Sequence, residues 1–154
     1  MLATILAATL LIAPLEPLHF LEGRWEATGG QKEKTGTGKT TFEVVNQGHA
    51  ILRKNFAIYP NAPRHDDVMI IYPENDRVRA DYWDSEGHII HYTVTIASDG
   101  SAVFVSDVIP KSPRFRLTYT RIGSGANGKF EVASPANPDA FAPYLAWSAH
   151  RVRD

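Results

Sequence analysis

Short runs of alternating apolar and polar residues fill most of the chain after Gly23 and predict an all-β protein. The runs are rich in Val, Ile, Thr, Tyr and Phe, and clusters of Gly, Pro, Asn and Asp separate them. This pattern is typical of a sandwich or barrel of short strands joined by tight turns. The predicted strands are residues 23–28, 39–45, 50–59, 68–72, 77–83, 89–96, 102–108, 115–122, 129–134 and 144–152.

The short connections restrict the topology. A few residues cannot cross over a sheet, so each strand is expected to pair antiparallel with the next one along the chain. A row of strands joined in this way has two exposed edges, and closure of the sheet removes both of them. We therefore predict a single up-and-down antiparallel β-barrel.

The turn Asp84-Ser85-Glu86-Gly87 fixes the register of one hairpin. A bulged turn with Gly87 in the left-handed conformation pairs Tyr82 with Ile90 and Asp81 with His91. One face of this hairpin is then apolar and the other is largely polar. The apolar face holds Val78, Ala80, Tyr82, Ile90, Tyr92 and Val94, and it is predicted to line the inside of the barrel.

The next hairpin is predicted from Asp99-Gly100, the usual pair for a two-residue turn. This turn pairs Ile96 with Val103 and Val94 with Val105. The pairing extends the apolar face to a third strand and places Phe104 and Ser106 on the opposite, outer face.

The segment Leu21-Glu22-Gly23-Arg24-Trp25, at the start of the first predicted strand, resembles the Gly-x-Trp opening of the calycin superfamily of lipocalin-like and fatty-acid-binding barrels. The resemblance implies a calycin barrel over residues 19–154 that binds a small molecule. It also implies that Trp25 closes one end of the barrel under a basic side chain from the last strand. Arg151 and Arg153 are the candidates for that contact.

Residues 1–18 begin with MLATILAATLLIAPL, which carries no charge. An apolar run of about 14 residues is too short for a membrane span of ~20 residues, so no integral membrane domain is expected, but it has the length of a signal-peptide core. We predict export to the periplasm or secretion. In the alternative, the segment is a short helix that caps the barrel of a cytoplasmic protein.

Composition excludes several classes of protein. The 154 residues include 16 Lys and Arg and 17 Asp and Glu, for a net charge of −1, and no Cys. Disulfides and cysteine-ligated metal sites are therefore absent, and no concentration of positive charge predicts a nucleic-acid partner. The oligomeric state is not predicted.

The expected activity is binding of a small apolar or amphipathic molecule, without cofactor or metal, in a cavity of the barrel. The predicted lining is Tyr82, Tyr92, Val94, Val105 and Tyr119, whose hydroxyl groups supply a few directed hydrogen bonds. Arg116 is a further candidate, because fatty-acid-binding barrels hold a carboxylate with an interior Arg. Strand alternation favours an outward Arg116, since an inward one would turn Phe115 and Leu117 outward.

Three alternatives stay open. If the polar face lined the lumen, His91 oriented by Asp81 could act as the general base of a proton-transfer enzyme such as an isomerase or lyase. If His150 entered the lumen, it could bind haem. A barrel filled by its own side chains would have only a structural or interaction role. The run His65-Asp66-Asp67 is predicted to be a solvated loop and not a cation site.

Overall fold

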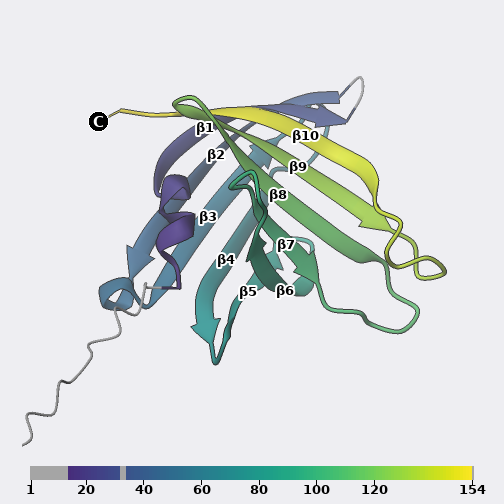
Figure 1. Ribbon diagram of the computed structural model, residues 1–154. Coiled ribbons are helices and arrows are strands. Elements are labelled where there is room, and N and C mark those ends of the chain that lie inside the picture. Colours follow the sequence, from purple (N-terminus) through teal and green to yellow (C-terminus); the bar gives the residue numbers. More distant parts are fainter. Residues whose placement is uncertain (1–13, 32–33, 154) are drawn as a thin grey trace, which may run out of the picture.

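The computed structural model describes residues 14–31 and 34–153 and is a closed, ten-stranded, up-and-down antiparallel β-barrel (Figure 1). Each strand pairs with the next one, and β1 pairs with β10 to close the sheet, which confirms the predicted fold class. The strands are β1 (Gly23–Gln31), β2 (Lys34–Val45), β3 (Ala50–Ile58), β4 (His65–Glu74), β5 (Arg77–Asp84), β6 (Ile89–Ile96), β7 (Ala102–Ser106), β8 (Arg114–Ile122), β9 (Gly125–Ala133) and β10 (Ala142–Arg151). Two short 3-10 helices accompany them, η1 (Glu16–Leu21) and η2 (Asn46–Gly48).

Side chains fill the middle of the barrel. Met69, Ile71, Tyr92 and Phe104 are each at most 1% exposed. Tyr92 meets Phe104 edge to face, with ring centroids 6.2 Å apart, and Phe104 meets Tyr119 in the same way at 6.0 Å. The predicted apolar face of the β5–β6 hairpin is therefore inside, as the sequence pattern indicated.

Helix η1 closes one end of the barrel. Leu15, Leu18 and Leu21 are each 1% exposed within the core. The indole Nε1 of Trp25 donates a hydrogen bond to the Leu21 carbonyl at 2.7 Å, and the Arg151 guanidinium lies 4.8 Å above the indole ring. Residues 1–13, on which the prediction of export depends, lie outside the described residues. No helix among the described residues has the length and hydropathy needed to span a membrane.

The register of the first hairpin is confirmed, and that of the second is wrong by one residue. The turn before β7 is not a two-residue turn, because Gly100 donates to the Ala97 carbonyl and Ala97 donates to the Ser101 carbonyl, each at 2.9 Å. Gly100 takes the left-handed conformation at φ +82°, as Gly87 does in the first hairpin. Val94 consequently pairs with Phe104.

The added turn residue reverses the faces of β7. Phe104 and Ser106 point into the barrel and are buried, whereas Val105 pairs with Thr93 on the outer face. The sequence prediction that Val105 lines the lumen is therefore wrong, since side chains alternate with a period of two and a shift of one residue exchanges the faces.

Strand β4 begins three residues earlier than predicted. His65, Asp66 and Asp67 are the first residues of β4 and pair with Ala57, Phe56 and Asn55 of β3, so the predicted loop is a strand. Charged residues have low strand propensity, and local pattern gives no sign that they extend the sheet. Their cross-strand partners stabilise the extension.

Candidate functional site

A polar layer crosses the interior at the end of the barrel opposite η1, which we call the far end. Because the strands alternate in direction, the last residues of β3 and β5 and the first residues of β4 meet there. Cross-strand partners on the inner face form the layer: Thr40 pairs with Asn55, Asn55 with Asp67, and Asp67 with Asp84. Met69 and Ile71 continue the same face of β4 into the apolar core.

A buried ion pair stabilises this layer on the side that faces the apolar core. Arg53 is 6% exposed and Asp67 is 5% exposed, and Arg53 Nη1 donates to Asp67 Oδ1. Asp67 Oδ2 accepts a hydrogen bond from Asn55 Nδ2 at 2.7 Å, and Asn55 Oδ1 accepts one from Thr40 Oγ1 at 2.6 Å. A buried charge of this kind requires a partner of opposite charge and further hydrogen bonds, and Asp67 has both.

Burial acts to raise the pKa of the Asp67 carboxyl, but Arg53 and the hydrogen bonds from His65 and Asn55 outweigh it and hold the pKa below its ordinary value. Asp67 is thus an ionised carboxylate inside the barrel. Its charge balances that of Arg53, and it also accepts hydrogen bonds from residues nearer the rim.

His65 connects the buried pair to the rim. Its Nε2 lies 3.2 Å from Asp67 Oδ2 and 3.2 Å from the Tyr82 hydroxyl, and its Nδ1 lies 2.8 Å from Glu86 Oε2. The hydrogen bond to Asp67 raises the pKa of His65, while partial burial opposes the rise. The Tyr82 hydroxyl in turn donates to Asp84 Oδ2 at 3.2 Å.

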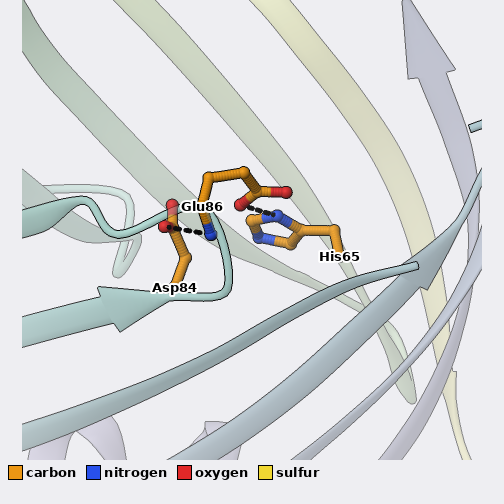
Figure 2. A group of neighbouring side chains, drawn as sticks. All are labelled: His65, Asp84 and Glu86. Carbon is orange, nitrogen blue, oxygen red and sulfur yellow. Dashed lines mark hydrogen bonds and ion pairs between the residues drawn. The ribbon is translucent and has the colours of Figure 1, made fainter. Parts of the chain in front are cut away.

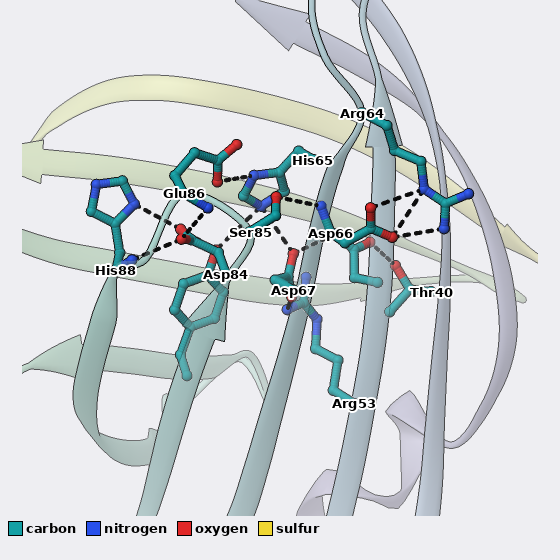
Figure 3. A network of polar contacts seen from close by, with 12 residues as sticks. Thr40, Arg53, Arg64, His65, Asp66, Asp67, Asp84, Ser85, Glu86 and His88 are labelled. Carbon is teal, nitrogen blue, oxygen red and sulfur yellow. Dashed lines mark hydrogen bonds and ion pairs between the residues drawn. The ribbon is translucent and has the colours of Figure 1, made fainter.

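The β5–β6 turn fixes the Asp84 carboxylate (Figure 3). Asp84 Oδ1 accepts from the backbone N–H of Glu86 at 3.0 Å and of His88 at 2.9 Å, and Asp84 Oδ2 lies 2.8 Å from His88 Nδ1. A carboxylate that accepts two turn amides is held in one orientation. The polar network of the far end therefore consists of Arg53, Asn55, His65, Asp67, Tyr82, Asp84 and Glu86.

Aromatic side chains form the opposite wall of the far end. Phe115 of β8 and Phe130 of β9 stack with centroids 5.7 Å apart at 15°, and Tyr144 of β10 meets Phe130 edge to face at 6.2 Å. Phe115 and Phe130 pack against the core but keep partial exposure, and Tyr144 is 48% exposed. Strands β4 and β9 are five places apart in the ring of ten, so the polar and aromatic walls face each other.

Two buried polar atoms below these walls lack hydrogen-bond partners among the described residues, Arg53 Nε and the Tyr119 hydroxyl. An unsatisfied buried donor costs about 1–3 kcal/mol, and such groups usually have a partner in the working protein. Both atoms are buried, and the Arg53 guanidinium lies beside the Tyr119 hydroxyl, where it opposes the rise that burial causes in the Tyr119 pKa.

The structure distributes the predicted ligand-binding residues over different places. Tyr82 belongs to the polar network and is half-buried. Tyr92, Val94 and Tyr119 are core residues at 1%, 6% and 5% exposure. The Tyr119 hydroxyl is fully buried and has no hydrogen-bond partner among the described residues.

Arg116 lies on the outer face, opposite to buried Leu117. Its Nε donates to Glu131 Oε2 at 2.6 Å, and its guanidinium lies 4.5 Å from the Phe141 ring. The outward orientation favoured from the sequence is therefore the observed one, and Arg116 does not enter the lumen.

The two alternative histidine sites also lie outside the barrel. His91 Nδ1 contacts Asp81 Oδ1 at 2.6 Å, as the predicted pairing implies, but the His91 side chain is 49% exposed on the outer face. The His150 side chain is 74% exposed beside Glu26, so it does not point toward a lumen haem. At the η1 end, Arg151 covers Trp25, while Arg153 follows the end of β10 and is exposed.

An open hollow of about 690 Å³ lies on the outer surface over β7 to β10 and reaches Thr28 of β1. Hydroxyl and amide side chains such as Thr118, Thr120 and Asn127 line much of it. It includes no residue of the polar network and no buried charge. We place the candidate site at the far end, where buried charges and partly exposed aromatic rings face each other.

Comparison with known proteins supports the fold. No family model matches the chain, and no curated protein matches it. The S-type phycobiliprotein lyase CPES from Guillardia theta aligns with a TM-score of 0.55 at 10% identity, over 88% of this chain and 89% of that one. The structure of EF1p2_mFAP2b bound to DFHBI aligns at 0.50 and 9% identity, over 90% and 99%.

A third solved structure, a de novo designed fluorescence-activating β-barrel, aligns with a TM-score of 0.47 at 11% identity, over 87% of this chain and 95% of that one. At these identities the likeness concerns the fold alone. Function must be argued from the residues of this chain.

Proposed function

We propose that the barrel binds a small amphipathic molecule at its far end. The observation that carries the proposal is the division of the inner surface there into a hydrogen-bonding wall on β3–β5 and a partly exposed aromatic wall on β8–β10. Binding sites for small molecules commonly combine apolar walls with a few fixed polar groups.

The aromatic wall supplies the affinity. Stacked Phe115 and Phe130, with Tyr144 across them, offer ring faces and edges to a flat apolar group. Removal of their partly exposed surface from water stabilises the complex by about 25 cal/mol per Å². A planar ligand loses little conformational entropy when it enters such a site.

The polar wall supplies orientation. The Tyr82 hydroxyl and the His65 ring are only partly buried, so they are the members of the network best placed to contact a ligand. Asp67 holds the His65 ring, and Asp84 accepts a hydrogen bond from the Tyr82 hydroxyl, which fixes both positions before a ligand arrives.

Two other findings agree with the proposal. EF1p2_mFAP2b, which shares this fold, is bound to DFHBI, and CPES is a phycobiliprotein lyase. The proposed assignment to the calycin superfamily rests on Trp25 at the start of β1 and on Arg151 above its ring. Small barrels can hold one small ligand, and η1 closes the opposite end of this barrel.

The test is binding of anilinonaphthalene sulfonate, an amphipathic fluorescent dye, to the purified chain. Phe130→Ala and Tyr144→Ala are each expected to raise the dissociation constant by about tenfold or more, because each removes part of the aromatic wall. The matched control is Ile122→Ala, since Ile122 is 54% exposed at the other end of β8. Native mass spectrometry of fresh protein provides a second readout, a co-purified molecule.

Equal dye affinity in the wild type and both wall variants would refute the proposal. So would dye-induced NMR shifts confined to residues outside the far end. Circular dichroism of each variant separates a lost binding surface from a lost fold.

A further inference from the structure

We infer that His65, Asp84 and Glu86 form a binding site for a divalent transition metal, with Zn²⁺ as the best match. The three residues come from the start of β4, the end of β5 and the turn between β5 and β6. One ligand atom from each lies within 4.8 Å of the other two. Figure 2 shows the His65 ring and the Glu86 carboxylate facing each other near Asp84.

The spacing of His65 and Glu86 is close to that of two ligands in a metal centre. Zinc binds imidazole nitrogen and carboxylate oxygen at about 2.0–2.2 Å, so neighbouring ligand atoms of a tetrahedral site stand about 3.3 Å apart. His65 Nδ1 and Glu86 Oε2 are already 2.8 Å apart. Glu86 has an exposed side chain in a turn and can adjust by rotation about its own bonds.

The contacts of the His65 ring call for a positive charge at this point, carried by a proton or by a metal ion. A ring whose Nε2–H donates to Asp67 presents a lone pair at Nδ1, and that lone pair faces the Glu86 carboxylate. A lone pair and an anion at this distance repel each other unless a proton or a metal ion lies between them. Asp84 adds a second carboxylate within 4.8 Å, and its Oδ2 also contacts His88 Nδ1 at 2.8 Å and the Tyr82 hydroxyl at 3.2 Å.

Asp67 provides an independent indication. A histidine that binds a metal commonly donates its other ring N–H to a carboxylate, which orients the ring and makes the ligating nitrogen more basic. Asp67 accepts from His65 in this way, and Arg53 and Asn55 hold the Asp67 carboxylate in turn. The arrangement behind His65 is therefore that of a supported metal ligand and not that of an isolated surface histidine.

The chemistry of the three ligands selects the class of metal. One imidazole and two carboxylates suit zinc and neighbouring transition metals, whereas calcium takes six to eight oxygen ligands. Glu86 and His65 are partly exposed, at 46% and 28% of their side chains, so water can complete the coordination. A zinc site with an open position can also hold a donor atom of a ligand.

The experiment is titration of the tag-free, metal-free protein with Zn²⁺ in competition with a chromophoric chelator. The wild type is expected to bind one zinc ion per chain. Glu86→Gln is expected to weaken binding by at least about tenfold, because loss of a direct ligand costs no less than loss of a supporting residue. The matched control is Asp66→Asn, which removes one exposed carboxylate nearby that contacts Arg64 and does not belong to the cluster.

Long-range nitrogen NMR of the histidines identifies the ligand atom, and a zinc-induced shift of His65 Nδ1 is expected. The inference is wrong if zinc fails to bind, if Glu86→Gln binds it as tightly as Asp66→Asn does, or if the shift occurs at another histidine. Failure of the dye test leaves these readouts unaffected, because Phe130→Ala and Tyr144→Ala change no member of the cluster. The metal site and the proposed function are therefore tested independently, and either can fail without affecting the other.

Discussion

Arg53 and Asp67 form an ion pair inside the barrel, where their side chains are 7% and 3% exposed. The pair joins β3 to β4 and fixes His65 above it. This pair marks the boundary between the core and the candidate site. Apolar side chains pack on one side of it, and the hydrogen-bonded rim lies on the other.

Replacing one member of the pair should lower the free energy of unfolding much more than replacing both members together. Arg53→Met leaves Asp67 charged and buried without its main partner, and the expected loss is about 3–5 kcal/mol of the free energy of unfolding. The double variant Arg53→Met/Asp67→Asn leaves no unpaired charge and should lose less than the single variant. Urea denaturation measures both. If the single variant lost under about 1 kcal/mol, the pair would have no such structural role.

Gly128 is required where Trp147 crosses β9. A Cβ atom at position 128 would lie 1.9 Å from the Trp147 indole Cε2, and both residues are cross-strand partners. Gly128→Ala is therefore expected to displace the indole and to destabilise the fold by about 1–3 kcal/mol. Thermal unfolding and tryptophan fluorescence report the change. Asn127→Ala, an exposed position beside it, should leave the fluorescence unchanged.

Glu131 should contribute stability that depends on pH. Its hydrogen bond with Arg116 lowers the pKa of the Glu131 carboxyl, burial opposes the effect, and Lys129 adds to the lowering. A lowered folded-state pKa gives stability that is present above the unfolded-state pKa and is lost as the pH falls through the folded-state value.

We therefore expect the free energy of unfolding of the wild type to fall on acidification below the ordinary pKa of glutamate, and Glu131→Gln to show a shallower fall. Denaturation at a series of pH values measures both curves. The neighbouring exposed variant Asn127→Ala serves as control and should keep the wild-type slope. Parallel curves for wild type and Glu131→Gln would contradict this assignment.

The outer pair of His91 and Asp81 should have little effect on function. His91→Ala removes a contact on an exposed face, so a change of about 0.2–1 kcal/mol in stability is expected. Dye affinity should equal that of the wild type, since the pair lies outside the barrel wall. A large loss of binding in His91→Ala would contradict this prediction and support the alternative in which His91 and Asp81 form a proton-transfer site.

Alternation along the strands was sufficient to predict the barrel and the interior face of its central hairpin. Val78, Ala80, Tyr82, Tyr92 and Val94 point inward because apolar residues recur with a period of two between turns that fix the register. The turn type predicted at Gly100 is wrong, so every side chain of β7 lies on the opposite face from the predicted one. A strand register predicted from the hydrophobic pattern is therefore correct only where the turn type that sets it is predicted correctly.

The polar network could not be found in the same way. On β3 three large apolar side chains, Leu52, Phe56 and Ile58, lie on the outer face, where Arg64 covers the Phe56 ring at 4.0 Å, and Ile51 is the one large apolar residue on the inner face. Arg53 and Asn55 lie on the inner face, so apolar alternation by itself favours the wrong side of this strand.

The sequence by itself determined the closed sheet, its antiparallel order and the apolar face of the β5–β6 hairpin, because those features follow from local periodicity and turn chemistry. Only the tertiary structure decided that Arg53, His65, Asp67 and Asp84 meet inside the far end. A charge is stable in the interior only beside its partner, and these partners are brought together by strand pairing across the sheet.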